Sequence, residues 1–168
     1  LAYTDNLTNL GNRPAFIRNL DQRFARNSTT QVCLRLVDID NFKRINDSLG
    51  HQTGDKLLIS LARRLRNSLN PGDNLARFAS NEFAVLLDDT GLETGQKVAS
   101  QLLMTLDKPM FVDNQLISVT GSVGVACSPL HGRDPQTLMR NAGLALHKAK
   151  ANGKHQVQVF TEALNAEA

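Results

Sequence analysis

Residues 31–55 read QVCLRLVDIDNFKRINDSLGHQTGD, and this stretch decides the fold. Residues 31–39 are a short β-rich run bounded by polar residues, which is typical of a central strand. We expect the NFKRIND segment that follows to be a short turn, and Gly50 and Gly54 to bracket a break in the chain. A helix is predicted from about 54 to 69, because leucine and alanine recur there at helical spacing.

The segments on either side alternate between helical and strand-like patterns. Apolar residues at helical spacing predict helices at 14–26, 92–106 and about 138–149. Short apolar or alternating runs predict strands at 74–78, 83–88, 115–127 and 155–160. The central order is therefore β-α-β-β-α-β. It predicts an α+β fold, a ferredoxin-like sheet with helices on one face and with added helices and strands.

Length and composition are those of one ordinary globular domain. The chain has 168 residues, of which 41% are hydrophobic and 21% charged. No apolar run approaches the roughly 18 residues of a membrane span and no signal peptide opens the chain, so we expect no membrane contact from this segment. We expect a cytoplasmic domain of a longer protein that could itself be membrane-tethered. A net charge of +3, 5% aromatic residues and no Trp argue against nucleic acid as a partner.

Two cysteines, Cys33 and Cys127, lie inside apolar strand-like runs. The sequence has no CxxC motif. It therefore predicts two buried free thiols in a reducing compartment.

Carboxylates gather where the predicted strands end. Asp38 and Asp40 close the first strand, and we expect them to point to opposite faces, one toward a ligand and the other in a structural role. The hairpin tip at 79–82 should lie beside them, because the first strand of this topology pairs with the middle ones. Acids at both places would bind Mg²⁺ and nucleotide phosphates. The spacing alone leaves open that the two acids simply end the strand.

Several segments together resemble the GGDEF domain family. They are DNLTNLGNR at 5–13, DIDNFKRINDSLGHQTGD at 38–55, RFASNEF at 77–83, SVGVA at 122–126 and AKANGK at 149–154. We therefore expect residues 1–161 to be a GGDEF domain, similar in fold to nucleotide cyclase and polymerase palm domains. The resemblance implies an enzyme that makes cyclic di-GMP from two GTP molecules, each held by one subunit of a homodimer.

The resemblance also implies roles for single residues. Asp38 and the carbonyl of Ile39 would hold the metal ion, with Mg²⁺ as the expected cofactor of GTP. Asn46 and Asp55 would grip the guanine edge, since an amide and a carboxylate complement its acceptors and donors. The residues expected on the triphosphate side are Lys43, Lys150 and Lys154, the last in place of the usual arginine. Without the resemblance, these side chains would be interpreted as helix caps and solvated lysines.

The motif that names the family is altered here to Ala79-Ser80-Asn81-Glu82-Phe83. Ala79 and Ser80 replace two glycines, which permit positive φ and close approach of the backbone to phosphate. Asn81 replaces an acid, and its amide brings no negative charge to a hard cation. Because phosphoryl transfer depends on metal positioning and charge neutralisation, we expect metal binding at Asn81 to be weak or lost and catalysis to suffer more than binding.

The product-inhibition motif of the family, RxxD, falls at 70–73, where this chain reads NPGD. Asp73 is retained, but Asn70 stands in place of the arginine. An asparagine lacks the guanidinium that binds guanine and phosphate in two places at once. The sequence therefore predicts that the inhibitory site is lost.

Three functions remain open at this point. The leading one is an inactive GGDEF domain that binds GTP and regulates a linked EAL domain, a phosphodiesterase that hydrolyses cyclic di-GMP to pGpG. Residues 162–168 would then begin the linker to that domain. The second is a weakly active diguanylate cyclase. The third is a dimerisation or partner-docking domain that binds no nucleotide.

Overall fold

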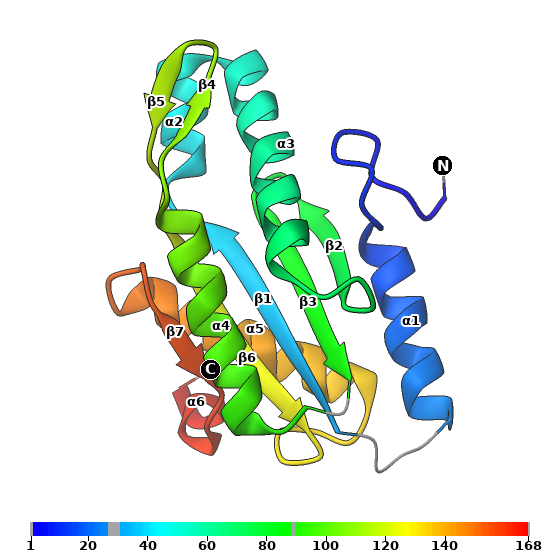
Figure 1. The fold of residues 1–168 in the computed structure, drawn as a ribbon. Helices are drawn as coiled ribbons and strands as arrows, with labels where there is room; N and C mark the ends of the chain where they lie inside the picture. The colour runs from blue at the N-terminus through cyan, green and yellow to red at the C-terminus, as the bar shows by residue number, and fades with distance from the viewer. Residues whose placement is uncertain (1, 27–30, 89, 168) are drawn as a thin grey trace.

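The computed structural model describes residues 2–26, 31–88 and 90–167 and shows a sheet covered by helices on both faces (Figure 1). The strands are β1 (Val32–Ile39), β2 (Asn74–Ala79), β3 (Glu82–Asp88), β4 (Met110–Val112), β5 (Gln115–Ile117), β6 (Gly121–Ser128) and β7 (Val157–Val159). The helices are α1 (Arg13–Arg26), α2 (Phe42–Leu49), α3 (His51–Ser68), α4 (Leu92–Asp107), α5 (Pro135–Ala151) and α6 (Glu162–Glu167).

Strand β1 lies at the centre of the main sheet, whose order is β2-β3-β1-β6-β7. It pairs antiparallel with β3 on one side and with β6 on the other, while β7 adds a parallel edge. Helices α3 and α4 complete a βαββαβ unit with these strands, so the predicted α+β architecture is confirmed. The central position of β1 explains why its sequence is a nearly continuous apolar run.

Two apolar cores lie on the two faces of the sheet. Val37 and Ile39 of β1 pack with α3 and α4, whereas Leu34 and Leu36 pack with α1 and α5. This division follows from strand geometry, because successive side chains point to opposite faces. The helices of the βαββαβ unit therefore share one face, as expected, and the added helices cover the other.

Two local predictions were wrong. The NFKRIND segment is not a turn, because Phe42, Ile45 and Leu49 form an apolar stripe on α2 that packs onto the core. The predicted strand at 115–127 is two strands, β5 and β6. Strand β5 belongs to a separate hairpin with β4, which turns at Asp113 and Asn114, both at positive φ as two-residue hairpin turns require.

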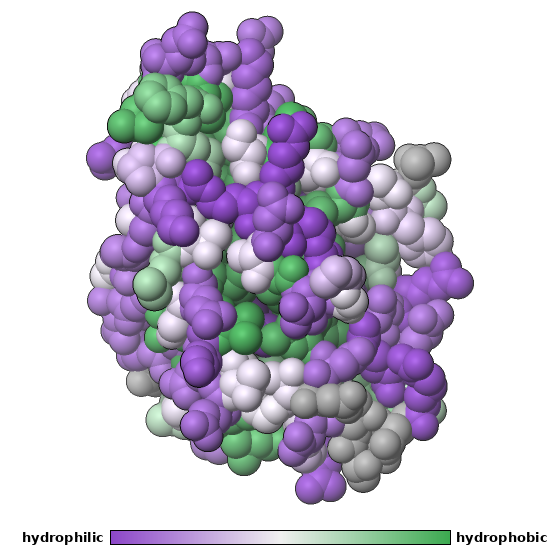
Figure 2. All heavy atoms as spheres, in the orientation of Figure 1, coloured by the Kyte–Doolittle hydropathy of each residue, from purple (hydrophilic) through white to green (hydrophobic). Residues whose placement is uncertain are grey.

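The β4–β5 hairpin extends beyond the sheet and carries an exposed apolar pair. Phe111 and Leu116 lie opposite each other in its register, with 76% and 61% of their surface exposed. Figure 2 shows apolar atoms gathered over this hairpin. Lys56 and Thr53 of α3 bond the side chain of Asp113 and hold the hairpin tip against that helix.

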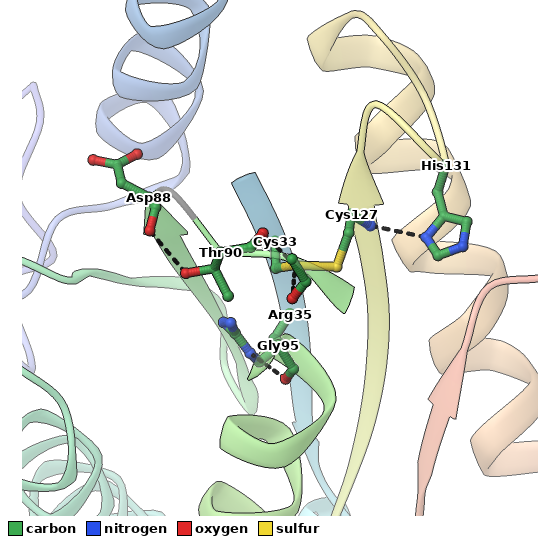
Figure 3. The surroundings of a disulfide bond; sticks show 8 residues. Cys33, Arg35, Asp88, Thr90, Gly95, Cys127 and His131 are labelled. Carbon is green, nitrogen blue, oxygen red and sulfur yellow. Dashed lines mark hydrogen bonds between the residues drawn. A yellow bond between two sulfur atoms is a disulfide. The ribbon is translucent and has the colours of Figure 1, made fainter. Parts of the chain in front are cut away.

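The prediction of two free thiols was also wrong. Cys33 of β1 and Cys127 of β6 are directly opposite in the sheet register, with Cα atoms 4.1 Å apart, and form a disulfide (Figure 3). The start of α4 packs against them, and a Cβ on Gly95 would lie 2.6 Å from Cys33 Sγ. A sequence separation of 94 positions conceals this pairing, which depends on strand register.

No helix in the described ranges 2–26, 31–88 and 90–167 combines the length and apolar character needed to cross a bilayer. The residues expected to begin a linker form α6, which packs its buried Leu164 against the core beside α5.

The contact between β6 and α5 yields a stability prediction. A Cβ on Gly124 would lie 2.3 to 2.7 Å from backbone atoms of α5 at Leu146 and Ala142. Gly124→Ala should therefore lower the free energy of unfolding by about 1–3 kcal/mol or more, because a helix backbone cannot move aside like a flexible side chain. Denaturant titration measures the change.

The matched control is Gly143→Ala on α5, where a Cβ would meet nothing within 4 Å. It should be neutral or stabilising by up to about 1 kcal/mol, because alanine is the better helix former. Equal effects of the two substitutions would contradict the tight packing of β6 on α5.

Candidate functional site

A cleft of about 570 Å³ opens where β1 ends and α2 begins. The tip of the β2–β3 hairpin and the C-terminal end of α5 form its other walls. Its lining residues are Asp38, Ile39, Asp40, Asn41, Phe42, Lys43, Arg44, Asp47, Asn81, Lys150 and Lys154. Pairing of β1 with β3 brings the hairpin tip to this point, since Asp38 is the register partner of Glu82.

Asp38 and Asp40 have different partners although they point the same way. The expectation of opposite faces was wrong, because residues two apart in an extended chain share a face. Asp40 is structural: its carboxylate accepts hydrogen bonds from the hydroxyls of Thr120 and Ser122, each at 2.7 Å, and from the backbone N–H of His155 at 3.1 Å. Asp38 is therefore the carboxylate left to serve the cleft.

Asn81, at the hairpin tip, is bonded to the end of β1. Its side-chain amide nitrogen donates to Asp38 Oδ1 and to the carbonyl of Ile39, the latter at 3.1 Å. The backbone N–H of Ile39 in turn donates to the carbonyl of Asn81 at 2.9 Å. The reverse orientation of the amide would set its oxygen against two other acceptors, so the bonding pattern requires the nitrogen here.

Lys150, from α5, closes the other side of the same carboxylate. Its ammonium forms an ion pair with Asp38 Oδ2. The side chain of Asp38 is 7% exposed, whereas that of Lys150 is 44% exposed. Both oxygens of this buried carboxylate therefore accept hydrogen bonds from protein donors, as a buried charge requires.

These residues do not fit the Mg²⁺ ion that the family resemblance implies. Mg²⁺ requires oxygen ligands in near-octahedral geometry. Asp38 and the Ile39 carbonyl already accept hydrogen bonds from the amide of Asn81. This amide presents a donor instead of an oxygen ligand, and it carries no negative charge to balance the cation. Within residues 2–26, 31–88 and 90–167, no group of three His, Cys, Asp or Glu side chains has the arrangement of a metal site.

Glu82 does not take the place of the missing acid. It lines a different cavity of about 510 Å³ between α1 and α5, together with Arg13 and Arg140. Burial raises the pKa of Glu82, and the charge of Asp38 raises it further, while Arg13 and Lys150 act in the opposite direction.

The residues expected on the guanine side lie at the junction of α2 and α3. The side-chain oxygen of Asn46 is buried and accepts no hydrogen bond. Gly54 allows this close packing, since a Cβ there would lie 1.7 Å from that oxygen. Asp55 follows on α3 and is exposed. Neither Asn46 nor Asp55 is among the residues that line the cleft, so the structure does not bring the expected guanine-side pair together with the metal-side residues in that cavity.

Cationic side chains gather on the remaining wall of the cleft. Lys43 lines it and is exposed, and the ammonium of Lys154 donates to Asn41 Oδ1 at 2.9 Å. Arg44 also lines the cleft, and the sequence analysis missed it. Its place directly after Lys43 was the available signal. Phe42 is buried and belongs to the core, as expected.

The altered motif tip differs from a glycine turn in its backbone. Neither Ala79 nor Ser80 adopts a positive φ, and a register irregularity separates Arg77 from Ala79. Arg77 pairs with Asp5 at 2.9 Å and donates to the carbonyl of Ser80 at 3.4 Å, which ties the opening segment of the chain to the tip. Phe83 points into the core.

The polar groups of the turn at 70–73 are hydrogen-bonded to one another and to Arg66. The carboxylate of Asp73 accepts from the backbone N–H of Asn70 at 2.9 Å. The guanidinium of Arg66 donates to the backbone carbonyls of both residues, at 2.6 and 2.9 Å. Burial lowers the pKa of Arg35 to about 10, and the charge of Asp73 opposes this shift. The retained acid therefore has an internal role in the turn.

Comparison with known proteins decides the family. The family model for the diguanylate cyclase GGDEF domain matches residues 2–156. The chain belongs to the GGDEF family. It is 39% identical to the cyclic di-GMP phosphodiesterase NbdA and 37% identical to the diguanylate cyclase DgcP, both of Pseudomonas aeruginosa. These alignments cover 98% and 94% of this chain but only 21% and 24% of the relatives, so it spans about a quarter or less of their length.

The fold agrees with solved GGDEF structures. The GGDEF domain of TpbB from Pseudomonas aeruginosa superimposes with a TM-score of 0.92 at 30% identity, covering 98% of both chains. The relatives of this GGDEF domain therefore include proteins named as cyclases and proteins named as phosphodiesterases. Their names do not assign an activity to this domain, so its activity has to be inferred from its own residues.

Removal of the Asn81 amide tests the bonding at the end of β1. Asn81→Ala should lower the free energy of unfolding by about 1–3 kcal/mol, because buried acceptors on Asp38 and Ile39 lose their donor. The exposed neighbour Ser80 supplies the control. The free energy of unfolding of Ser80→Ala should stay within about 0.5 kcal/mol of the wild-type value. If chemical denaturation finds the two variants equally stable, the hydrogen bonds of Asn81 do not support the fold.

Glu82 yields a pH-dependent prediction. Its folded pKa lies above the ordinary value of 4.5, so the folded state binds the proton more tightly than the unfolded state does. Its contribution to stability is therefore lost as the pH rises through the window above 4.5. Glu82→Gln removes this loss, and the variant's melting temperature relative to wild type should increase from about pH 4 to about pH 7. A relative melting temperature that decreases with pH would contradict the raised pKa.

Proposed function

We propose that this GGDEF domain forms no cyclic di-GMP, binds GTP and regulates a linked EAL phosphodiesterase. One observation carries the proposal. The amide of Asn81 donates to Asp38 and to the Ile39 carbonyl, where the family signature supplies an acid for a metal ion.

Loss of the acid acts on chemistry more than on binding. Phosphoryl transfer is catalysed by positioning and by neutralising the charge that develops on the transferred group, which is largely the work of metal ions. In this cleft the metal-side oxygens are bonded to Asn81 and Lys150. Cβ atoms on Ala79 and Ser80 further restrict how closely a phosphate can approach the tip.

Recognition of GTP rests on groups that remain in place. The amide of Asn46 carries donors and an acceptor that complement the guanine edge once its side chain turns away from Gly54, and the exposed carboxylate of Asp55 can accept from an N–H group of the base. Lys43 and Lys154 line the cleft on the side where phosphates would extend. Base recognition and phosphate attraction can thus persist without catalysis.

Regulation of a linked EAL domain is the role that suits a GGDEF domain without cyclase activity. Two relatives, NbdA of Pseudomonas aeruginosa and PdeR of Escherichia coli, are named cyclic di-GMP phosphodiesterases, and they share 39% and 35% identity with this chain. An active cyclase would oppose a phosphodiesterase in the same protein. GTP bound here shifts the activity of such a neighbour if it binds one conformation of the protein more tightly than the other.

The catalytic part of the proposal is tested by product analysis. Incubation of the purified domain with GTP and Mg²⁺ or Mn²⁺, followed by chromatography, should give no cyclic di-GMP. Asn81→Asp alone should restore little, because Ala79 and Ser80 still replace the two glycines. Clear formation of cyclic di-GMP by the wild-type domain would establish the weak cyclase instead.

The binding part is tested by calorimetry with GTP. Wild type should release heat on titration, and Asp55→Ala should abolish it by removing the guanine acceptor. Glu93→Ala, which removes an exposed acid from the first turn of α4, serves as the control and should bind as wild type does. No heat with wild type would favour a domain that docks partners without nucleotide.

A further inference from the structure

We infer that Asn81 and Lys150 substitute for the divalent cation, so that this cleft takes a metal-free nucleoside triphosphate. The nucleotide part rests on the proposed function, whereas exclusion of the metal rests on the residues alone. The cleft would then be an anion site that uses protein donors throughout, rather than a weakened metal site.

The first argument is that each oxygen that a cation would use already accepts from a protein donor. A cation at this position would contact Asp38 and the carbonyl of Ile39, the two groups to which the amide of Asn81 donates. Lys150 neutralises the remaining oxygen of the carboxylate. The two donors thus supply the positive charge and the bonds that a cation would otherwise supply.

The second argument is the charge around the cleft. Its lining carries four cationic side chains, Lys43, Arg44, Lys150 and Lys154, against three acids, Asp38, Asp40 and Asp47. An acid at position 81 would make the two numbers equal. Asparagine leaves an excess of positive charge, which attracts a polyphosphate and repels a divalent cation.

The third argument is that the amide is held in place. The backbone of Asn81 is bonded to β1 through the N–H of Ile39, so the side chain cannot leave Asp38 by movement of the tip alone. Asp38 is 5% exposed, and a metal ion that entered the cluster would have to displace this donor and give up part of its own water shell, which Mg²⁺ does reluctantly. Displacement of Asn81 by Mg²⁺ is therefore unfavourable.

The test compares Asn81→Asp with wild type in the absence of nucleotide. The variant sets two carboxylates against one ammonium, so without metal its melting temperature should be lower than that of wild type. Added Mg²⁺ or Mn²⁺ should raise the melting temperature of the variant by about 2–4 °C or more and leave wild type unchanged. Asn19→Asp, the same chemical change on α1, controls for added charge and should gain nothing from metal.

Paramagnetic broadening by Mn²⁺ is the second measurement, and it needs no variant to fold. In amide spectra of wild type, Mn²⁺ should cause no selective broadening at residues 38–41 and 80–82. Selective broadening there, or metal stabilisation of wild type equal to that of Asn81→Asp, would overturn the inference.

Nucleotide titration completes the test. The affinity of wild type for GTP should be as high in EDTA as in Mg²⁺ or higher, because Mg²⁺ in solution removes the metal-free nucleotide, whereas Mg²⁺ should strengthen binding to Asn81→Asp by about tenfold or more. If wild type binds GTP only with Mg²⁺, the inference is wrong although the proposed function stands. If it binds GTP in neither condition, the proposed function fails, and the metal measurements still decide whether the cation is excluded.

Discussion

A buried carboxylate at the end of the central strand must be neutralised, and this domain does so with its own side chains. Asp38 receives the amide of Asn81 and the ammonium of Lys150, from a hairpin and a helix that are distant in sequence. Three elements, β1, the β2–β3 tip and α5, converge on this one group. Removal of Lys150 would leave the charge of Asp38 without a counter-ion in a place that water scarcely reaches, and removal of Asn81 would leave a buried carboxylate oxygen without its donor.

The position of Asp38 depends on how β1 is held. Antiparallel pairing on both sides, with β3 and β6, fixes the register that brings the hairpin tip to the strand end. Gly124 lets α5 approach β6 closely, and α5 carries Lys150 toward the cleft. The disulfide between Cys33 and Cys127 joins β1 to β6 near the opposite end of both strands. The site thus rests on a central strand restrained at both ends.

Much of the fold could be predicted from the sequence, because long helices and the βαββαβ order leave clear periodic patterns. Short elements could not: α2 has only 8 residues and the strands of the β4–β5 hairpin only 3 each. The disulfide and the partners of Asp40 depend on strand register, which periodicity does not determine. The motif resemblance located Asp38, Asn81 and Lys150, but no sequence pattern reveals that the amide of Asn81 presents its nitrogen, and that orientation sets its chemistry.

The central claim is that an amide donor occupies the place of a cation, and NMR can observe that bond directly. Scalar coupling across hydrogen bonds should connect the side-chain nitrogen of Asn81 to the carboxyl carbon of Asp38 and to the carbonyl carbon of Ile39. The account predicts that both couplings are present and persist at saturating Mg²⁺. Absence of the couplings, or their disappearance when Mg²⁺ is added, would contradict it.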